Sequence, residues 1–295
     1  MSFLSNIEYR DVGLNDRAKL TEILYGEPDR GCEYTFGNIY IWAKVYGTKI
    51  GWFGNTALVK FTTYKNSGLL PVGSDLEGGV KAALEDGFKT FIALRKEDCE
   101  RLDQLFPEKF TFEPMKDAGE YVYNSDDLIN LRGKKYHGKR NHISKYMSLY
   151  PGYTFGEINE QNIAEVRKMH NAWCQENGCA GDDGLEQESC AVRIAFENFF
   201  ELGFDGGYIT DGEKIVAFAM GERINDTSYC VHIEKAYRDV DGAYTVINRD
   251  FASHFCKDYM YINREDDAGE EGLRKAKLSY HPAYVTEKYT ATVKE

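Results

Sequence analysis

The stretch GGYITDGEKIVAFAMGERINDTSYCVHIEKA, residues 206–236, contains three runs that read as strands. The runs are separated by Asp211-Gly212 and Asn225-Asp226, which are dipeptides typical of tight turns between neighbouring strands. The pattern therefore predicts three strands joined by two hairpins.

The segments around these strands complete an ordered set of elements. Helical periodicity precedes the strands over 162–176 and 188–202, after a short predicted strand at 153–158. A helix over 244–257, a strand over 259–265 and a short helix over 270–280 are predicted to follow.

The first 124 residues contain a similar series. The predicted elements are a strand meander over 35–64, a helix over 76–86, a strand over 89–95, a helix over 97–105 and a strand at 121–124. Meander, helix, strand and helix thus occur twice, which predicts a mixed α/β (α+β) chain with two similar domains.

Bulk composition indicates a folded protein without a membrane span. The 295 residues are 42% hydrophobic and carry a formal net charge of −12. No basic and apolar leader opens the sequence, and no run of about 18 apolar residues occurs, so we expect a cytoplasmic protein with no integral membrane segment. The overall acidity restricts any nucleic-acid contact to a local patch.

The seven cysteines are scattered, and we expect them to be reduced thiols. Cys174 and Cys179 lie near His170, but no CxxC pair or second ligand pair completes a zinc site. We therefore predict no bound metal. Asp266 and Asp267 are interpreted as helix-capping residues, with metal binding as the alternative.

A basic segment interrupts the acidic background. Six basic residues and no acidic one lie between Arg132 and Lys145. Read as one helix over 125–150 that begins at Ser125, the segment places Arg132, Lys135 and Lys139 within its apolar arc and Lys134 and Lys145 outside it.

Cations that face the packed side need an anionic partner. We therefore predict that Arg132, Lys135, Lys139 and Arg140 contact a phosphate-bearing ligand. A solvated basic face with buried aliphatic stems is the alternative.

The order of elements after residue 150 resembles that of GNAT-type acyltransferases. In that fold the fourth strand diverges from the fifth, and the loop before the next helix presents backbone N–H groups to a pyrophosphate. The corresponding segment here is YRDVDGAYTVIN, residues 237–248, so Arg238, Gly242 and Ala243 are candidate donor-binding residues.

Acyl transfer requires a base and a proton for the leaving group. Glu234, near the end of the third strand, is the candidate base, and His232 is its rival. Tyr280 is the candidate proton donor. Each has a structural alternative: Glu234 as an ion-pair partner, His232 as a core histidine and Tyr280 as a core aromatic.

A second basic cluster lies near the C-terminus. Arg274 and Lys277 fall on one face of the predicted helix over 270–280, at positions i and i+3. We predict that they join the first cluster in one anion-binding pocket.

Three blocks carry a family resemblance. They are DLINLRGKKYHGKRNHISKY (127–146), IEKAYRDVDGAYTVINRDFA (233–252) and YINREDDAGEEGLRKAKLSYHP (261–282). These blocks resemble a family of soluble bacterial proteins related to the C-terminal catalytic domain of phosphatidylglycerol lysyltransferase, over roughly residue 20 to the end.

The resemblance implies two tandem GNAT-like domains, 1–124 and 151–295, with the basic helix 125–150 between them. It also implies an aminoacyl-tRNA donor and, as acceptor, a lipid headgroup or a cell-wall precursor amine. The lysyltransferase itself has a large membrane-embedded portion that is not found in this sequence, so a soluble acceptor is expected at least equally.

From these observations we predict an acyl- or aminoacyltransferase that binds its donor between the two halves. The donor, acyl-CoA or aminoacyl-tRNA, is a co-substrate, and no permanently bound cofactor is expected. The acceptor is an amine or hydroxyl of a small molecule, a lipid or a peptide. The alternative is a non-catalytic pair of GNAT-like domains that binds a nucleotide, tRNA or peptide.

Overall fold

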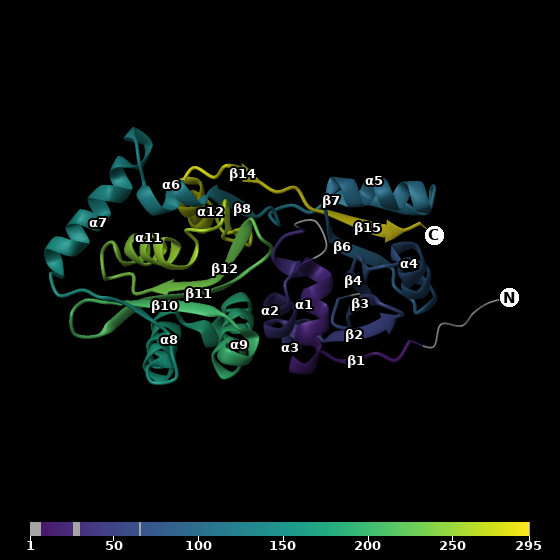
Figure 1. Ribbon diagram of the computed structural model, residues 1–295, viewed down its shortest axis with the longest axis horizontal. Coiled ribbons are helices and arrows are strands. Elements are labelled where there is room, and N and C mark those ends of the chain that lie inside the picture. The colour runs from purple at the N-terminus through teal and green to yellow at the C-terminus, as the bar shows by residue number, and fades with distance from the viewer. Residues whose placement is uncertain (1–6, 26–29, 65, 295) are drawn as a thin grey trace. The chain divides into compact units, whose positions relative to one another are not determined.

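The computed structural model describes residues 7–25, 30–64 and 66–294, which divide into two compact units (Figure 1). The first unit extends to Glu120 and also contains Asp266–Glu270 and the segment from Thr286 onward. The second unit comprises Tyr121–Glu265 and Glu271–Val285.

The first unit contains helices α1 to α5 and strands β1 to β7 and β15. In chain order they are β1 (Arg10–Asp11), α1 (Arg17–Tyr25), α2 (Phe36–Ile41), α3 (Ala43–Tyr46), β2 (Thr48–Phe53), β3 (Thr56–Phe61), β4 (Ser67–Leu69), β5 (Val72–Gly73), α4 (Leu76–Glu85), β6 (Thr90–Leu94), α5 (Lys96–Leu105), β7 (Phe110–Pro114) and β15 (Tyr289–Val293).

The second unit contains the remaining helices and strands. They are β8 (Tyr121–Asn124), α6 (Ser125–Asn130), α7 (His137–Leu149), β9 (Phe155–Glu157), α8 (Ile163–Asn177), α9 (Asp183–Glu197), α10 (Phe199–Leu202), β10 (Asp205–Thr210), β11 (Ile215–Arg223), β12 (Ser228–Ala236), α11 (Ala243–Phe255), β13 (Tyr261–Asn263), α12 (Glu271–Leu278) and β14 (Tyr284–Val285).

The two sheets have equivalent strand orders. The first runs β1-β2-β3-β4-β6-β15-β7, with β5 paired to β3, and the second runs β9-β10-β11-β12-β13-β8-β14. In each sheet the fourth and fifth strands are parallel, β4 to β6 and β12 to β13, whereas the other pairs are antiparallel. The predicted tandem of mixed α/β, GNAT-like folds is therefore confirmed.

The sixth strand of each sheet comes from a distant part of the sequence. Strand β15, next to the C-terminus, pairs with β6 and β7 in the first sheet, while β8, which precedes the other elements of the second unit, pairs with β13 and β14. The unit boundaries therefore differ from the expected ranges of 1–124, 125–150 and 151–295. The basic segment lies within the second unit, and the last strand belongs to the first.

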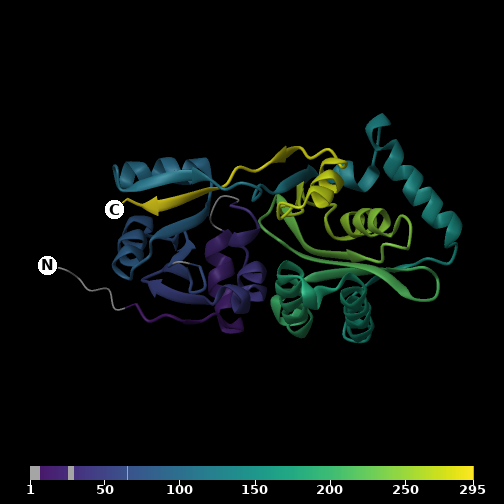
Figure 2. The same ribbon diagram turned by 180° about the vertical axis from the view of Figure 1, so that it is seen from behind.

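Helices cover both faces of the second sheet. Helices α8 and α9 lie on one face, and α11 lies on the other together with α6 and α7 (Figures 1 and 2). Val246, Ile247 and Phe251 of α11 are buried against that sheet, while Val166 and Trp173 are buried on α8. The apolar stripes of α8 and α11 thus account for this core.

Two of the predicted elements are wrong. Residues 36–46, predicted to begin a strand meander, form α2 and α3, because the Thr35 side chain accepts a hydrogen bond from the Asn38 N–H and caps α2. The single helix predicted over 125–150 is broken, because Leu131 has a left-handed backbone (φ 48°) and Gly133 has φ 86°. The segment therefore forms α6, a short 3-10 turn and α7.

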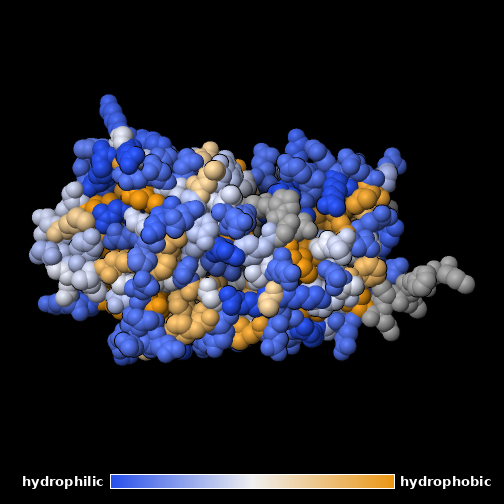
Figure 3. Space-filling view, in the orientation of Figure 1, coloured by the Kyte–Doolittle hydropathy of each residue, from blue (hydrophilic) through white to orange (hydrophobic). Residues whose placement is uncertain are grey.

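The surface agrees with the polar composition of the chain. On the face shown in Figure 3, hydrophilic residues surround smaller groups of hydrophobic ones. In the part of the chain that the structure describes, no helix is both long enough and apolar enough to cross a bilayer.

A buried charge cluster attaches the C-terminal strand segment to the first unit. The Lys288 ammonium, just before β15, lies 2.5 Å from Glu33 Oε1 and 2.9 Å from Glu120 Oε1. Burial lowers the pKa of Lys288, but Glu120 and Glu33 outweigh this effect and hold the pKa well above its ordinary value. The cluster therefore keeps Lys288 charged inside the protein.

We predict that Lys288→Met lowers the free energy of unfolding by about 3–5 kcal/mol, because it leaves two carboxylates without their buried cation. Urea unfolding measures the change. The control is Lys81→Met, which removes an exposed ion pair with Glu77 and should change stability by less than about 0.5 kcal/mol. Equal effects of the two substitutions would contradict the assigned role of Lys288.

Candidate functional site

The candidate site begins where β12 and β13 separate. Their parallel pairing covers only Ser228–Cys230 against Tyr261–Asn263, whereas β12 continues to Ala236. Glu234 therefore lies on the part of β12 that no longer pairs with β13, and Arg264 follows directly after β13. The strand divergence expected of a GNAT-like fold is present, and it places an acidic and a basic residue at the opening.

Glu234 and Arg264 form an ion pair. Arg264 Nη2 lies 2.9 Å from Glu234 Oε1, and each side chain is 12% exposed. The other carboxylate oxygen, Oε2, accepts a hydrogen bond of 3.2 Å from Asn248 Nδ2 on α11. Both oxygens of Glu234 thus have partners, which gives this side chain a fixed orientation.

Two buried polar atoms next to this pair lack a partner among the described residues. They are Arg264 Nη1, a donor, and Asn248 Oδ1, an acceptor. Because its amide nitrogen donates to a carboxylate, Asn248 must direct Oδ1 elsewhere. Unsatisfied buried groups are rare, so a donor and an acceptor beside one ion pair indicate a place where a ligand or water binds.

Lys139 extends from α7 toward the same cluster. Its ammonium lies 3.6 Å from the centre of the Tyr280 ring and 2.7 Å from Ser279 Oγ. Burial and the nearby Arg264 guanidinium lower the pKa of Lys139 to about 8, although Glu234 opposes the shift. A lysine with this pKa is partly neutral near physiological pH and can accept a proton.

Tyr280 lies beneath Lys139 and beside Arg264. The Arg264 guanidinium carbon is 5.1 Å from the centre of the Tyr280 ring, and the tyrosine is 5% exposed. Burial raises the pKa of Tyr280 to about 12, with Arg264 opposing and Glu234 supporting the shift. The phenol therefore stays protonated near neutral pH. Lys139, Glu234, Arg264 and Tyr280, which we call the acyl-site cluster, all belong to the second unit.

The other basic residues predicted around 132–140 do not enter this cluster. Arg132 and Lys135 are exposed and pair with Asp126 and Asp127, so their predicted inward direction is wrong. The prediction assumed one continuous helix, in which these residues share a face. Because the helix is broken at Leu131 and Gly133, residues on either side of the break no longer lie on one common face. Lys134 and Lys145 are exposed, as expected.

Arg140 has a structural role. Its Nη1 donates to the carbonyl oxygens of Leu131 and Gly133, at 2.5 Å and 2.8 Å. The guanidinium thereby satisfies backbone acceptors at the helix break.

The loop before α11 requires glycine at position 242 because of its backbone and its packing. Gly242 has φ 88°, and a Cβ there would lie 2.7 Å from the His142 carbonyl oxygen. Helix α7 therefore packs against the loop, and Lys145 pairs with Asp241 beside it. Ala243 is buried, whereas Arg238 is exposed.

Lys277 and Arg274 lie in α12. The buried Lys277 ammonium donates to the backbone carbonyl oxygens of Arg264 and Glu265, so it supports the turn after β13. Arg274 is partly buried one helical turn earlier.

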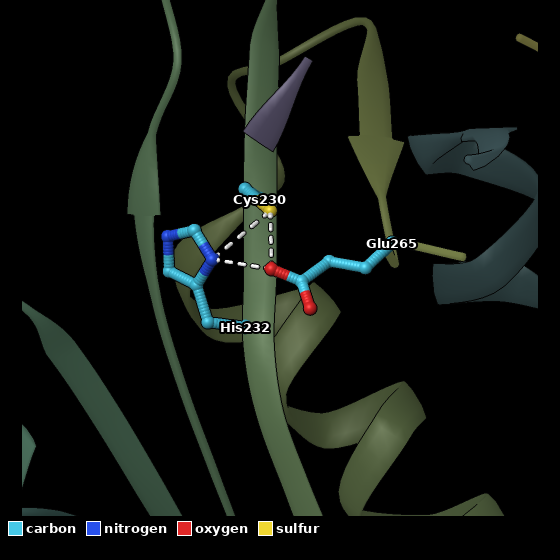
Figure 4. Close-up of side chains that lie close together, drawn as sticks. All are labelled: Cys230, His232 and Glu265. Carbon is cyan, nitrogen blue, oxygen red and sulfur yellow. Dashed lines mark hydrogen bonds and ion pairs between the residues drawn. The ribbon is translucent and has the colours of Figure 1, made fainter. Parts of the chain in front are cut away.

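His232 belongs to a separate cluster. A bulge in the pairing with β11 occurs at this point, where Met220 opposes Ile233 but Gly221 opposes Val231. The His232 Nδ1 lies 2.7 Å from Glu265 Oε1, and Nε2 lies 3.1 Å from Glu222 Oε1 (Figure 4 shows the first contact). Burial lowers the pKa of His232, but Cys230, Glu222 and Glu265 outweigh it and hold the pKa well above its ordinary value.

Two members of the site do not follow from the sequence patterns. These two residues are Arg264 and Asn248. The available signal for Asn248 was a polar residue on the apolar face of a helix, between Ile247 and Phe251. Nothing in the sequence indicates that Arg264 pairs with Glu234.

Comparison with known proteins places these features in a family. A model of the family described as "Phosphatidylglycerol lysyltransferase, C-terminal" matches residues 27–292. A solved conserved protein of unknown function from Bacteroides thetaiotaomicron is 35% identical, with a TM-score of 0.92, over 98% of this chain and 100% of that one.

More distant relatives share the fold. The C-terminal domain of a putative lysylphosphatidylglycerol synthetase from Agrobacterium fabrum is 15% identical, with a TM-score of 0.68, over 95% of this chain and 92% of that one. An uncharacterized protein of Mycoplasmoides gallisepticum is 24% identical over 180 residues, which are 59% of this chain and 56% of that protein. The chain thus spans little more than half of this curated relative.

The family match covers the acyl-site cluster and most of both sheets, and it confirms the family resemblance predicted from the sequence. The chain belongs to the family of the phosphatidylglycerol lysyltransferase C-terminal domain.

Proposed function

We propose that this protein is an aminoacyl- or acyltransferase that reacts at the acyl-site cluster. An amine or hydroxyl of the acceptor attacks the carbonyl carbon of an activated ester or thioester. The acceptor loses a proton, and the ribose oxygen or thiolate of the donor leaves. The observation that carries this proposal is a partly neutral lysine, Lys139, beside the buried Glu234–Arg264 ion pair. In this pair, Arg264 Nη1 is a buried donor that lacks a partner among the described residues.

Lys139 is the proposed general base, in place of Glu234. Both Glu234 oxygens have partners, whereas the Lys139 amine has a pKa near 8 and lies at the edge of the cluster. A base with a pKa close to the working pH is the most effective in general-base catalysis. Glu234 then acts as the residue that fixes Arg264.

Arg264 is the proposed stabiliser of developing negative charge. Its Nη1 is buried and lacks a partner among the described residues, so it is already desolvated and oriented. A preorganised donor of this kind stabilises the oxyanion of acyl transfer, typically by about 3–4 kcal/mol. The proton-donor role of Tyr280 remains a proposal, and its pKa of about 12 supplies the protonated phenol that this role needs.

The family name supports aminoacyl transfer to a hydroxyl, because a phosphatidylglycerol lysyltransferase moves a lysyl group to a lipid headgroup. We therefore propose aminoacyl-tRNA as the first donor to test and acyl-CoA as the second. For the acceptor we propose a lipid headgroup hydroxyl or a soluble amine.

One observation favours a second function, a module that binds such a donor without turnover. Tyr280 is buried and both Glu234 oxygens are occupied, so two of the predicted catalytic groups are engaged by the protein itself. Donor binding without product formation across a panel of acceptors would support this alternative.

We predict that Lys139→Met reduces the transfer rate by about 10²–10⁴-fold, because it removes the base and keeps the aliphatic stem. The measurement is single-turnover transfer from bacterial tRNA charged with radiolabelled amino acids, and in parallel from acetyl-CoA, to phosphatidylglycerol vesicles and soluble amines. Lys145→Met is the control, because Lys145 is exposed on the same helix and pairs with Asp241. A similar rate loss in both variants would remove Lys139 from the mechanism.

The pH dependence tests the same role. The base must be neutral, so the wild-type rate should rise with pH through about 8, the pKa of Lys139, and then level off. Lys139→Arg should lose this rise, because arginine stays protonated. A wild-type rate that is flat between pH 7 and pH 9, roughly one unit either side of that pKa, would exclude Lys139 as the base.

We also predict that Glu234→Gln lowers the free energy of unfolding by about 3 kcal/mol, because Arg264 then remains buried without its counterion. Urea unfolding provides the measurement. Glu165→Gln, which removes an exposed pair with Lys168, should change stability by less than about 0.5 kcal/mol. An unchanged stability of Glu234→Gln would show that solvent, and not Glu234, balances the charge of Arg264.

A further inference from the structure

A thiol, an imidazole and a carboxylate converge on β12 beside the acyl-site cluster. Cys230 Sγ lies 3.5 Å from His232 Nδ1 and 3.9 Å from Glu265 Oε1, and His232 Nδ1 lies 2.7 Å from the same oxygen. Figure 4 shows the three side chains directed toward one point. Cys230 is fully buried, the His232 side chain is 1% exposed, and the Glu265 side chain is 24% exposed.

These spacings suit a tetrahedral metal ion. With bonds of about 2.3 Å to sulfur and about 2.0 Å to nitrogen and oxygen, the ligand atoms of a tetrahedral site are separated by roughly 3.3–3.6 Å. The sulfur–nitrogen distance already has this value, and the sulfur–oxygen distance exceeds it by a few tenths of an ångström. Only the distance between His232 Nδ1 and Glu265 Oε1 must increase, by about half an ångström.

The second nitrogen of His232 has the partner that a metal-bound histidine requires. Nε2 lies 3.1 Å from Glu222 Oε1 on the neighbouring strand β11. When Nε2–H donates to this carboxylate, Nδ1 presents its lone pair toward Cys230 and Glu265. Such carboxylate–histidine pairs fix the tautomer and orientation of metal ligands.

Glu265 is held in an unusual backbone conformation at this position. Its φ is 60°, a left-handed value that is uncommon for residues other than glycine. Its N–H bonds Asn263 Oδ1, and its carbonyl accepts from the Tyr121 N–H and the Lys277 ammonium. The fold therefore maintains backbone strain that directs this carboxylate toward His232.

We propose that Cys230, His232 and Glu265 bind a divalent transition-metal ion of borderline softness, such as Zn²⁺. The thiolate and one carboxylate neutralise the two charges of the ion, and the neutral imidazole is the third ligand. Binding displaces protons from the thiol and from the imidazolium.

The metal would connect β12 to the residue that follows Arg264. Glu265 is adjacent in sequence to Arg264, and His232 is two residues before Glu234. A bound ion therefore holds the two strands together at the point where their pairing ends. This role is independent of whether Lys139 acts as the base.

Cobalt binding tests the site directly. The full chain is stripped with a chelator and titrated with Co²⁺, followed by competition with Zn²⁺. We expect one equivalent of Co²⁺ with the visible bands of tetrahedral coordination and a thiolate-to-cobalt charge-transfer band, all removed by Zn²⁺. Cys230→Ser should lose the charge-transfer band. Glu222→Gln should retain it with an affinity about 10–100-fold lower.

Cys174→Ser is the matched control, because Cys174 contacts Cys179 and His170 and offers an alternative thiol for the metal. This variant should bind Co²⁺ as the wild type does. The proposal is overturned if the wild-type protein shows no thiolate band. It is also overturned if the band survives Cys230→Ser or disappears in Cys174→Ser. If a variant fails to fold, the presence or absence of the thiolate-to-cobalt band in the wild-type protein still tests the proposal.

Discussion

The ion pair between Glu234 and Arg264 is the interaction on which the candidate site depends. It forms across the gap where β12 and β13 stop pairing, and both side chains are largely removed from solvent. A buried charge is tolerated only when it is paired and hydrogen-bonded, so neighbouring groups must adjust to it. Asn248 completes the partners of Glu234, and Tyr280 provides an aromatic surface for Arg264. Burial, together with the Arg264 guanidinium, lowers the pKa of Lys139.

The strand order explains how the fold creates this gap. Each sheet contains one parallel pair, β4 with β6 and β12 with β13, and each continues with a strand from a distant part of the sequence. In the second unit, β8 pairs with β13 and not with β12, which leaves the last part of β12 unpaired on that side. Lys277 then holds the turn after β13 through the carbonyl oxygens of Arg264 and Glu265. The positions of Arg264 and Glu265 are therefore set by backbone contacts.

Local sequence patterns predicted those helices and strands that are determined by neighbouring residues. The hairpins of β10 to β12 follow from their turn residues, and α4, α5, α8 and α11 follow from helical periodicity. The alternation of apolar and polar residues over 36–46 predicts strands, but the Thr35 cap determines a helix. The break at Leu131 has no local signal in the sequence, because its carbonyl oxygen is satisfied by the Arg140 side chain of the following helix. For the site, Glu234, Tyr280 and Lys139 were identified, but their pairing with Arg264 and Asn248 depends on long-range packing that one sequence does not reveal.

The most direct test of this account is the titration of Lys139 within the folded protein. Reductive ¹³C-methylation of the lysines followed by NMR reports the charge of each amine as a function of pH, and Lys139→Arg identifies the resonance. We predict a midpoint near 8 for Lys139, and a lower midpoint in Glu234→Gln, because Glu234 raises this pKa. A midpoint near the ordinary lysine value of about 10.4, unchanged in Glu234→Gln, would show that Lys139 lies outside the influence of the buried ion pair and would contradict the account.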